Sequence, residues 1–232
     1  MSRTPIALLL PLWLLIGAAC ASSAKLQRSF SSENPRSAYT SIENVDGILV
    51  RSSTTISPEA IARARYLVSH VLSNRPDIRE HLKVIGFAID IIGKDQVLSD
   101  LPYYTHLRGE KTGDGRDYDT GTRGVGGREV CSVGEENLLC LPKQHYFQED
   151  ILIHEFAHSL KFLMPARESQ AIDAAYENAK RRRLYPLDIY MMANSQEYWA
   201  GGTQAWFNAT VRTDVNAGVN TRDKLRSHDP EL

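Results

Sequence analysis

The sequence predicts an α+β fold in which a small mixed sheet packs on a helix carrying the string H-E-x-x-H, followed by a helical C-terminal half. Three observations predict this class. The run 84–92 is dense in β-branched and apolar residues, which is typical of a buried strand. An apolar stripe at helical spacing accompanies the H-E-x-x-H string within 148–164. Two later segments, 168–182 and 194–207, have helical periodicity as well.

The first 24 residues are expected to be a secretory signal peptide and not part of the fold. A short positive region around Arg3 precedes the apolar stretch 6–19, and small-x-small cleavage sites follow it. A lipoprotein signal cleaved before Cys20 is the alternative, although Gly17 stands where such signals usually have Leu. No later segment approaches the roughly eighteen apolar residues of a membrane span, so integral membrane association is not expected. The protein is predicted to be secreted.

The rest of the chain is expected to form one domain. Residues 25–56 are rich in Ser, Asn and Thr, which predicts a flexible N-terminal segment with a short strand at 47–50. The domain then spans 57–232, and a helix-start pattern at 229–231 leaves a truncated C-terminus as one interpretation. The formal net charge of −1 and a single basic run argue against nucleic acid as a partner. Nothing in the sequence indicates the oligomeric state.

Local signals mark the ends of several elements. Ser57 and Pro58 have the pattern of a helix N-cap and first helical residue, and the helix they begin should end at 74–76. The segment 103–127 contains seven glycines and is expected to be a long loop, with a turn at its end, 123–127.

Cys131 and Cys140 remain once the signal peptide is removed. In an exported chain such a pair is expected to form one disulfide, with two buried free thiols as the alternative.

The string His154-Glu155-Phe156-Ala157-His158 indicates a metal site. Residues four apart share one face of a helix, so both imidazoles can bind one Zn²⁺. Glu155 then lies beside the metal, where it can act as the general base towards a water molecule, as in metallopeptidases. The alternative is two histidines on a solvated helix face.

A catalytic zinc ion needs a third protein ligand and an open position. Glu197 fits best, because it lies near the start of a separate predicted helix that could pack beside the first. The other downstream candidates are Glu168, Asp173, Glu177, Asp188 and His228.

The string HEFAH, followed by Tyr190 and by Glu197-Tyr198-Trp199-Ala200, resembles the gluzincin metallopeptidases related to anthrax lethal factor and the Pro-Pro endopeptidases. The stretch 132–140 also resembles secreted lethal-factor-like proteins, and the resemblance covers about residues 84–229. It implies a zincin-like domain that holds one catalytic Zn²⁺ and hydrolyses a peptide or protein substrate. It further implies that Glu197 is the third ligand and that Tyr190 stabilises the oxyanion. The strand at 131–140 could pair with an extended substrate.

The chain departs from the family pattern at Gly201, where an acid that orients a zinc-binding histidine is usual. Losing such a partner typically costs about ten- to a hundredfold in metal affinity or activity. The sequence therefore predicts a secreted zinc endopeptidase. The alternative is a weakened or inactive secreted binding or effector protein on a degenerate metallopeptidase fold. A small structural protein with a chance H-E-x-x-H string is a third interpretation.

Overall fold

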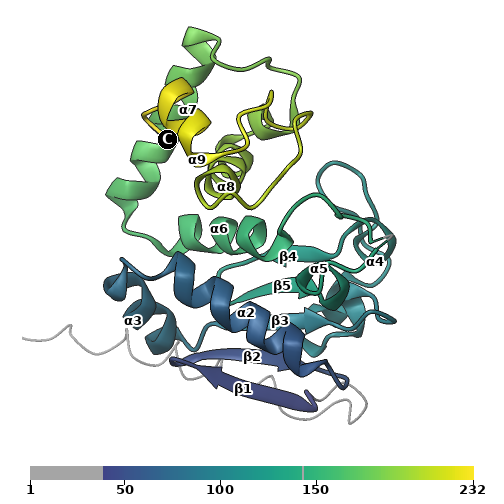
Figure 1. Ribbon diagram of the computed structural model, residues 1–232. Coiled ribbons are helices and arrows are strands. Elements are labelled where there is room, and N and C mark those ends of the chain that lie inside the picture. Colours follow the sequence, from purple (N-terminus) through teal and green to yellow (C-terminus); the bar gives the residue numbers. More distant parts are fainter. Residues whose placement is uncertain (1–38, 143) are drawn as a thin grey trace, which may run out of the picture. The chain divides into compact units, whose positions relative to one another are not determined.

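The structure is a computed structural model that describes residues 39–142 and 144–232. It contains a five-stranded mixed sheet with the strand order β1-β2-β3-β5-β4 (Figure 1). The central strands β2, β3 and β5 are parallel, and the edge strands β1 and β4 are antiparallel to their neighbours. The strands span Ser41–Val45 (β1), Ile48–Ser52 (β2), Ala88–Ile92 (β3), Gly124–Gly126 (β4) and Val130–Gly134 (β5). The expected mixed α+β class is confirmed.

The N-terminal part of the described chain is a hairpin, whereas a flexible segment was expected over 25–56. The two-residue loop Asp46-Gly47 joins β1 to β2, and its φ values of 51° and 91° fit the type I′ turn that Asp-Gly favours. Gly47 N also donates to Asn44 Oδ1 over 2.7 Å. Strand β1 has a polar sequence and lies at the sheet edge. It is a strand because it pairs with β2, and its sequence alone does not predict one. The predicted signal peptide, 1–24, lies outside the described residues.

Two helices, α2 (Pro58–Val71) and α3 (Pro76–Ile85), connect β2 to β3. Helix α2 begins as predicted, because Ser57 Oγ accepts a hydrogen bond from Ala60 N over 3.1 Å. Helix α3 takes up the first residues of the run 84–92 that was predicted as a strand. Gly86, with φ 69° in the left-handed region, ends that helix, so β3 is shorter than predicted.

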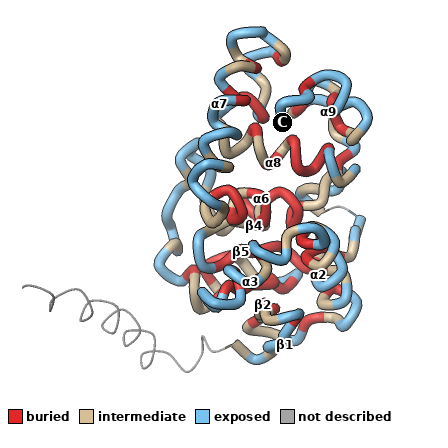
Figure 2. The backbone as a smooth tube through the Cα atoms, turned by 90° about the vertical axis from the view of Figure 1, so that its left-hand side faces the viewer, coloured by how far each residue is buried: buried red, intermediate tan, exposed pale blue. Residues whose placement is uncertain are grey.

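Strand β3 is buried along its whole length and separates two clusters of the core. On one face, Ile89 and Ile91 pack with α2 and with α6 (Ile151–Leu163), the helix that carries H-E-x-x-H. On the other face, Ala88 and Ile92 pack with the short helices η2 (Leu98–Asp100) and η3 (Pro102–Leu107). A strand covered on both faces lacks the alternation of apolar and polar residues, and the polar residue of β3, Asp90, is buried and pairs with Arg51 over 2.7 Å. In Figure 2 the buried residues, in red, gather in α6 and the strands beside it.

The C-terminal half is helical, as predicted. It consists of α7 (Ala166–Arg182), η4 (Tyr190–Met192), α8 (Ser195–Trp206) and α9 (Arg222–His228), which share a hydrophobic cluster of their own. Helix α8 packs on α6, and Trp199 Nε1 donates to Ala157 O over 2.9 Å. Among the described residues, no helix is both long and apolar enough to cross a membrane.

Three local expectations are corrected. Cys131 is buried in β5 and Cys140 is exposed beyond α5 (Glu135–Leu138), and both thiols are free, so the expected disulfide is absent. The glycine-rich 123–127 stretch contains edge strand β4 instead of a simple turn, after the short helix α4 (Tyr118–Gly121). Asp229 ends α9 and does not begin a new helix.

Candidate metal centre

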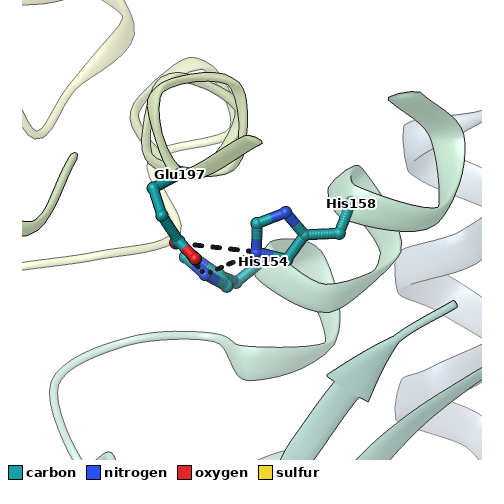
Figure 3. Close-up of side chains that lie close together, drawn as sticks. All are labelled: His154, His158 and Glu197. Carbon is teal, nitrogen blue, oxygen red and sulfur yellow. Dashed lines mark hydrogen bonds and ion pairs between the residues drawn. The ribbon is translucent and has the colours of Figure 1, made fainter. Parts of the chain in front are cut away.

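Helix α6 presents two imidazoles on one side. It begins at Asp150, whose side chain accepts a hydrogen bond from Ile153 N over 3.1 Å and so caps the first turn. Apolar residues of α6 face the sheet and α2. Because His154 and His158 are four residues apart, their side chains lie together on the helix face towards α8 (Figure 3).

Helix α8 supplies the carboxylate. Asn194 caps this helix, and its Oδ1 accepts hydrogen bonds from Gln196 N and Glu197 N, each over 2.9 Å. The cap places Glu197 in the first helical turn, and the Trp199 hydrogen bond to α6 fixes that turn against the imidazoles. Figure 3 shows Glu197 pointing from its own helix towards both histidines of α6.

Three potential ligand atoms meet at one point. His154 Nε2 lies 3.1 Å from His158 Nε2 and 3.2 Å from Glu197 Oε2, and His158 Nε2 lies 3.6 Å from the same oxygen. Ligands at about 2.0–2.2 Å from a tetrahedral metal ion are about 3.3 Å apart, so the observed separations bracket that value. Glu197 Oε2 is also buried without a hydrogen-bond partner. An orphaned buried carboxylate oxygen facing two imidazoles fits a missing cation. The residues could therefore hold one metal ion.

The other candidates for the third ligand lie elsewhere or have other partners. Glu168 pairs with Arg75, and Asp173 accepts from Lys161 over 2.7 Å. Glu177 pairs with Lys180, and His228 Nε2 donates to Leu184 O. Asp188 lines the cleft in front of the centre but does not belong to the ligand group.

His154 and Glu197 shift each other's pKa values at this centre. Burial lowers the pKa of His154, but the nearby carboxylates of Glu197, Glu155 and Glu149 outweigh it and raise that pKa to about 9. Burial raises the pKa of Glu197, but the two imidazoles outweigh it and hold that pKa well below its usual range. A cation bound by these residues must displace any proton that His154 holds.

Glu155 lies next to the ligand group and is held by the edge strand. Its Oε2 accepts a hydrogen bond from Gly126 N over 2.8 Å, and its side chain lines the same cleft as His154 and Glu197. The backbone of β4 comes very close to α6: a Cβ added at Gly126 would lie 2.3 Å from Glu155 O and 2.7 Å from His158 Cβ. Only glycine permits this approach.

Gly126→Ala is therefore expected to destabilise the protein by about 1–3 kcal/mol, because β4 and α6 must move apart to admit the methyl group. Gly113→Ala is the matched control, since a Cβ at Gly113 meets nothing within 4 Å. Urea unfolding of both variants measures the difference. Native-like stability of Gly126→Ala would show that the close approach is not needed.

Tyr190 stands at the wall of the cleft. Its ring lies 6.5 Å from that of His154, centroid to centroid, and the residue is 40% exposed. Burial of the hydroxyl and the nearby Glu197 raise the pKa of Tyr190, so the hydroxyl stays protonated and able to donate. The cleft has a volume of about 660 Å³ and lies between α6, α8 and the loops that carry Arg116 and Arg212.

Two glutamines in contact with the imidazoles were missed by the sequence analysis. Gln204 Oε1 lies 3.2 Å from His154 Nδ1, and Gln196 Oε1 lies 3.4 Å from His158 Nδ1. Both are on α8, as is Glu197. Gln204 follows Glu197 by two helical turns, so helical periodicity could have found it. Gly201 also lines the cleft, and a Cβ added there would meet Met191 at 3.1 Å.

No protein-family model matches this sequence, and no curated protein matches it. The fold, in contrast, is similar to 15 chains of solved structures. These similarities show that solved structures share the α+β fold of this chain.

One of these neighbours is the Pro-Pro endopeptidase PPEP-2 from Paenibacillus alvei, with a TM-score of 0.54 and 17% sequence identity. The similarity covers 79% of this chain and 92% of that chain. At this identity the similarity establishes the fold alone.

Proposed function

We propose that the protein is a secreted zinc-dependent endopeptidase of the gluzincin type. The observation that carries the proposal is the buried, unpartnered Glu197 Oε2, which faces the Nε2 atoms of His154 and His158 in a cleft that Glu155 also lines. Two imidazoles and one carboxylate are a donor set found at catalytic zinc sites, which leave one position open. The peptidase-like fold supports a peptide or protein as the substrate.

His154, His158 and Glu197 would hold the ion. When bound, Zn²⁺ would polarise the peptide carbonyl and lower the pKa of a water molecule towards about 7. Glu155 then accepts the proton of the attacking water on its carboxylate and later delivers it to the leaving amine nitrogen. The Gly126 N–H, 2.8 Å from Glu155 Oε2, fixes this carboxylate while its other oxygen remains available to the water. Tyr190 donates a hydrogen bond to the oxygen on which negative charge develops.

Zinc removal is the direct test. The purified protein is expected to contain close to one zinc ion per chain, to cleave peptides from a broad library, and to lose this activity when a chelator removes the metal. Added zinc should restore it. Mass-spectrometric detection of cleaved peptides, together with metal analysis, measures both quantities. A library containing Pro-Pro peptides includes the substrate class that the name of the structural neighbour states.

Two outcomes would favour other functions. Zinc uptake without cleavage of any peptide would favour a secreted binding or effector protein on a degenerate fold. A protein that takes up no zinc would leave H-E-x-x-H as a chance string. Gly201 supports the degenerate alternative, whereas the contact of Gln204 Oε1 with His154 Nδ1 over 3.2 Å supports a centre whose imidazole still has an orienting partner.

A further inference from the structure

The amide of Gln204 is oriented by its surroundings. Its Nε2 lies 3.2 Å from Asp150 O, a backbone carbonyl that can only accept a hydrogen bond, and 3.3 Å from Glu149 Oε2. The other oxygen of that carboxyl, Oε1, pairs with Arg212 Nη1 over 2.8 Å. The NH₂ end of the amide must therefore face Glu149 and Asp150, and the carbonyl end must face His154.

This orientation determines which nitrogen of His154 carries a proton. Gln204 Oε1 can only accept, so His154 Nδ1, 3.2 Å away, must donate. The neutral imidazole then has its lone pair on Nε2, the atom that faces His158 and Glu197. Gln204 itself is buried, with 2% of its surface exposed, so water does not compete for these contacts.

We propose that Gln204 is the positioning residue of the metal centre: it holds His154 as the Nδ1–H tautomer with Nε2 directed at the ion. The proposal rests on the proposed zinc site and goes beyond it, since Gln204 does not belong to the group of metal ligands. The chain Arg212–Glu149–Gln204–His154 runs from the cleft wall to the ligand group. Its buried contacts join the N-terminus of α6 to α8 and so keep two ligand-bearing helices in register.

Only an amide satisfies this position. A carboxylate at 204 could accept from His154 Nδ1, but it would face the Glu149 carboxylate at the distance where Gln204 Nε2 now donates. Two carboxylates in contact cannot both stay ionised without strong repulsion. An acid would thus disturb the centre here, unless position 149 becomes an amide that can donate in turn.

The test measures the zinc affinity of the purified full chain by competition with a chromophoric chelator. Gln204→Met keeps the bulk of the side chain but has neither amide end, and it is expected to weaken zinc binding by about ten- to a hundredfold. Gln204→Glu is expected to weaken it too. Adding Glu149→Gln to Gln204→Glu should bring the affinity back towards the native value, because an amide at 149 can donate to the carboxylate. A side chain that only fills space would not produce this rescue.

Thr203→Ala is the matched control. Thr203 is the buried neighbour on α8, and its Oγ1 donates to Trp199 O within the helix, so its loss removes a buried hydrogen bond without touching the centre. Its zinc affinity is expected to stay native. Native affinity in Gln204→Met, or in Gln204→Glu alone, would overturn the inference while leaving the proposed function intact. A native chain that binds no zinc would overturn both.

Discussion

Replacing Glu155 with glutamine is expected to lower the rate of peptide hydrolysis by a factor on the order of 10²–10⁴ while zinc stays bound. Glutamine has the same size, and its amide oxygen can accept the hydrogen bond that Gly126 N now donates over 2.8 Å. The three ligand side chains are unchanged. What is lost is an oxygen basic enough to take a proton from water, so the effect should fall on kcat, with zinc content unchanged.

The control for this variant is Glu177→Gln on α7. Glu177 is exposed and pairs only with Lys180 within its own helix, so the same chemical change there should leave kcat and zinc content at native values. Native kcat in Glu155→Gln would show that another group accepts the proton. Loss of zinc from Glu155→Gln would show that Glu155 helps to hold the ligand group together, which the proposed mechanism does not require.

Residues near in sequence were predicted best. The spacing of His154 and His158 on a helix follows from helix geometry alone, and the cap at Ser57 follows from local backbone chemistry. Glu197 could be chosen only as one candidate among several, because the contact between α6 and α8 depends on packing across the core. The Trp199 hydrogen bond to Ala157 O, which fixes that contact, has no signature in either helix.

Elements whose structure depends on contacts with distant parts of the chain could not be predicted from their own sequences. Strand β4 has the sequence Gly-Val-Gly, which lacks strand propensity, and its glycines are required by the approach of α6 instead. The hairpin at Asp46-Gly47 had a clear turn signal that the polar sequence of β1 obscured. The predicted role of β5 as a substrate-binding strand is corrected, because β3 and β4 cover both of its edges and β4 is the edge strand beside Glu155.

The expected disulfide failed for a related reason. The pairing of Cys131 with Cys140 was predicted from an even number of cysteines in a chain expected to be exported. The chain instead turns into α5 after β5, which leaves the first thiol in the core and the second exposed. The position of Gly201 was likewise interpreted from a sequence pattern alone, whereas the partner of His154 stands three residues further along α8, at Gln204.

Replacing Glu197 with glutamine is expected to weaken zinc binding by more than a hundredfold, or more than about 2.7 kcal/mol of binding free energy. We expect more than a hundredfold because loss of a residue that only orients a metal ligand already costs about ten- to a hundredfold in affinity, and Glu197 is itself a proposed ligand. A neutral amide lacks the charge that neutralises the ion, and Glu197 Oε2 is the only carboxylate oxygen in the ligand group among the described residues. Competition with a chromophoric chelator measures the change.

Glu168→Gln tests the same substitution at a rival position. Glu168 was a candidate third ligand, but it pairs with Arg75 at the surface, so its variant should bind zinc as tightly as the native chain. If Glu197→Gln kept native affinity, the two histidines would have to be completed by a different ligand, and the orphaned Glu197 Oε2 would need another explanation. Because Glu197 also raises the pKa of His154, its replacement should lower that pKa and reduce the number of protons released when zinc binds at neutral pH. A drop in affinity together with fewer protons released per bound zinc ion would tie the carboxylate to the ion and to the imidazole at once.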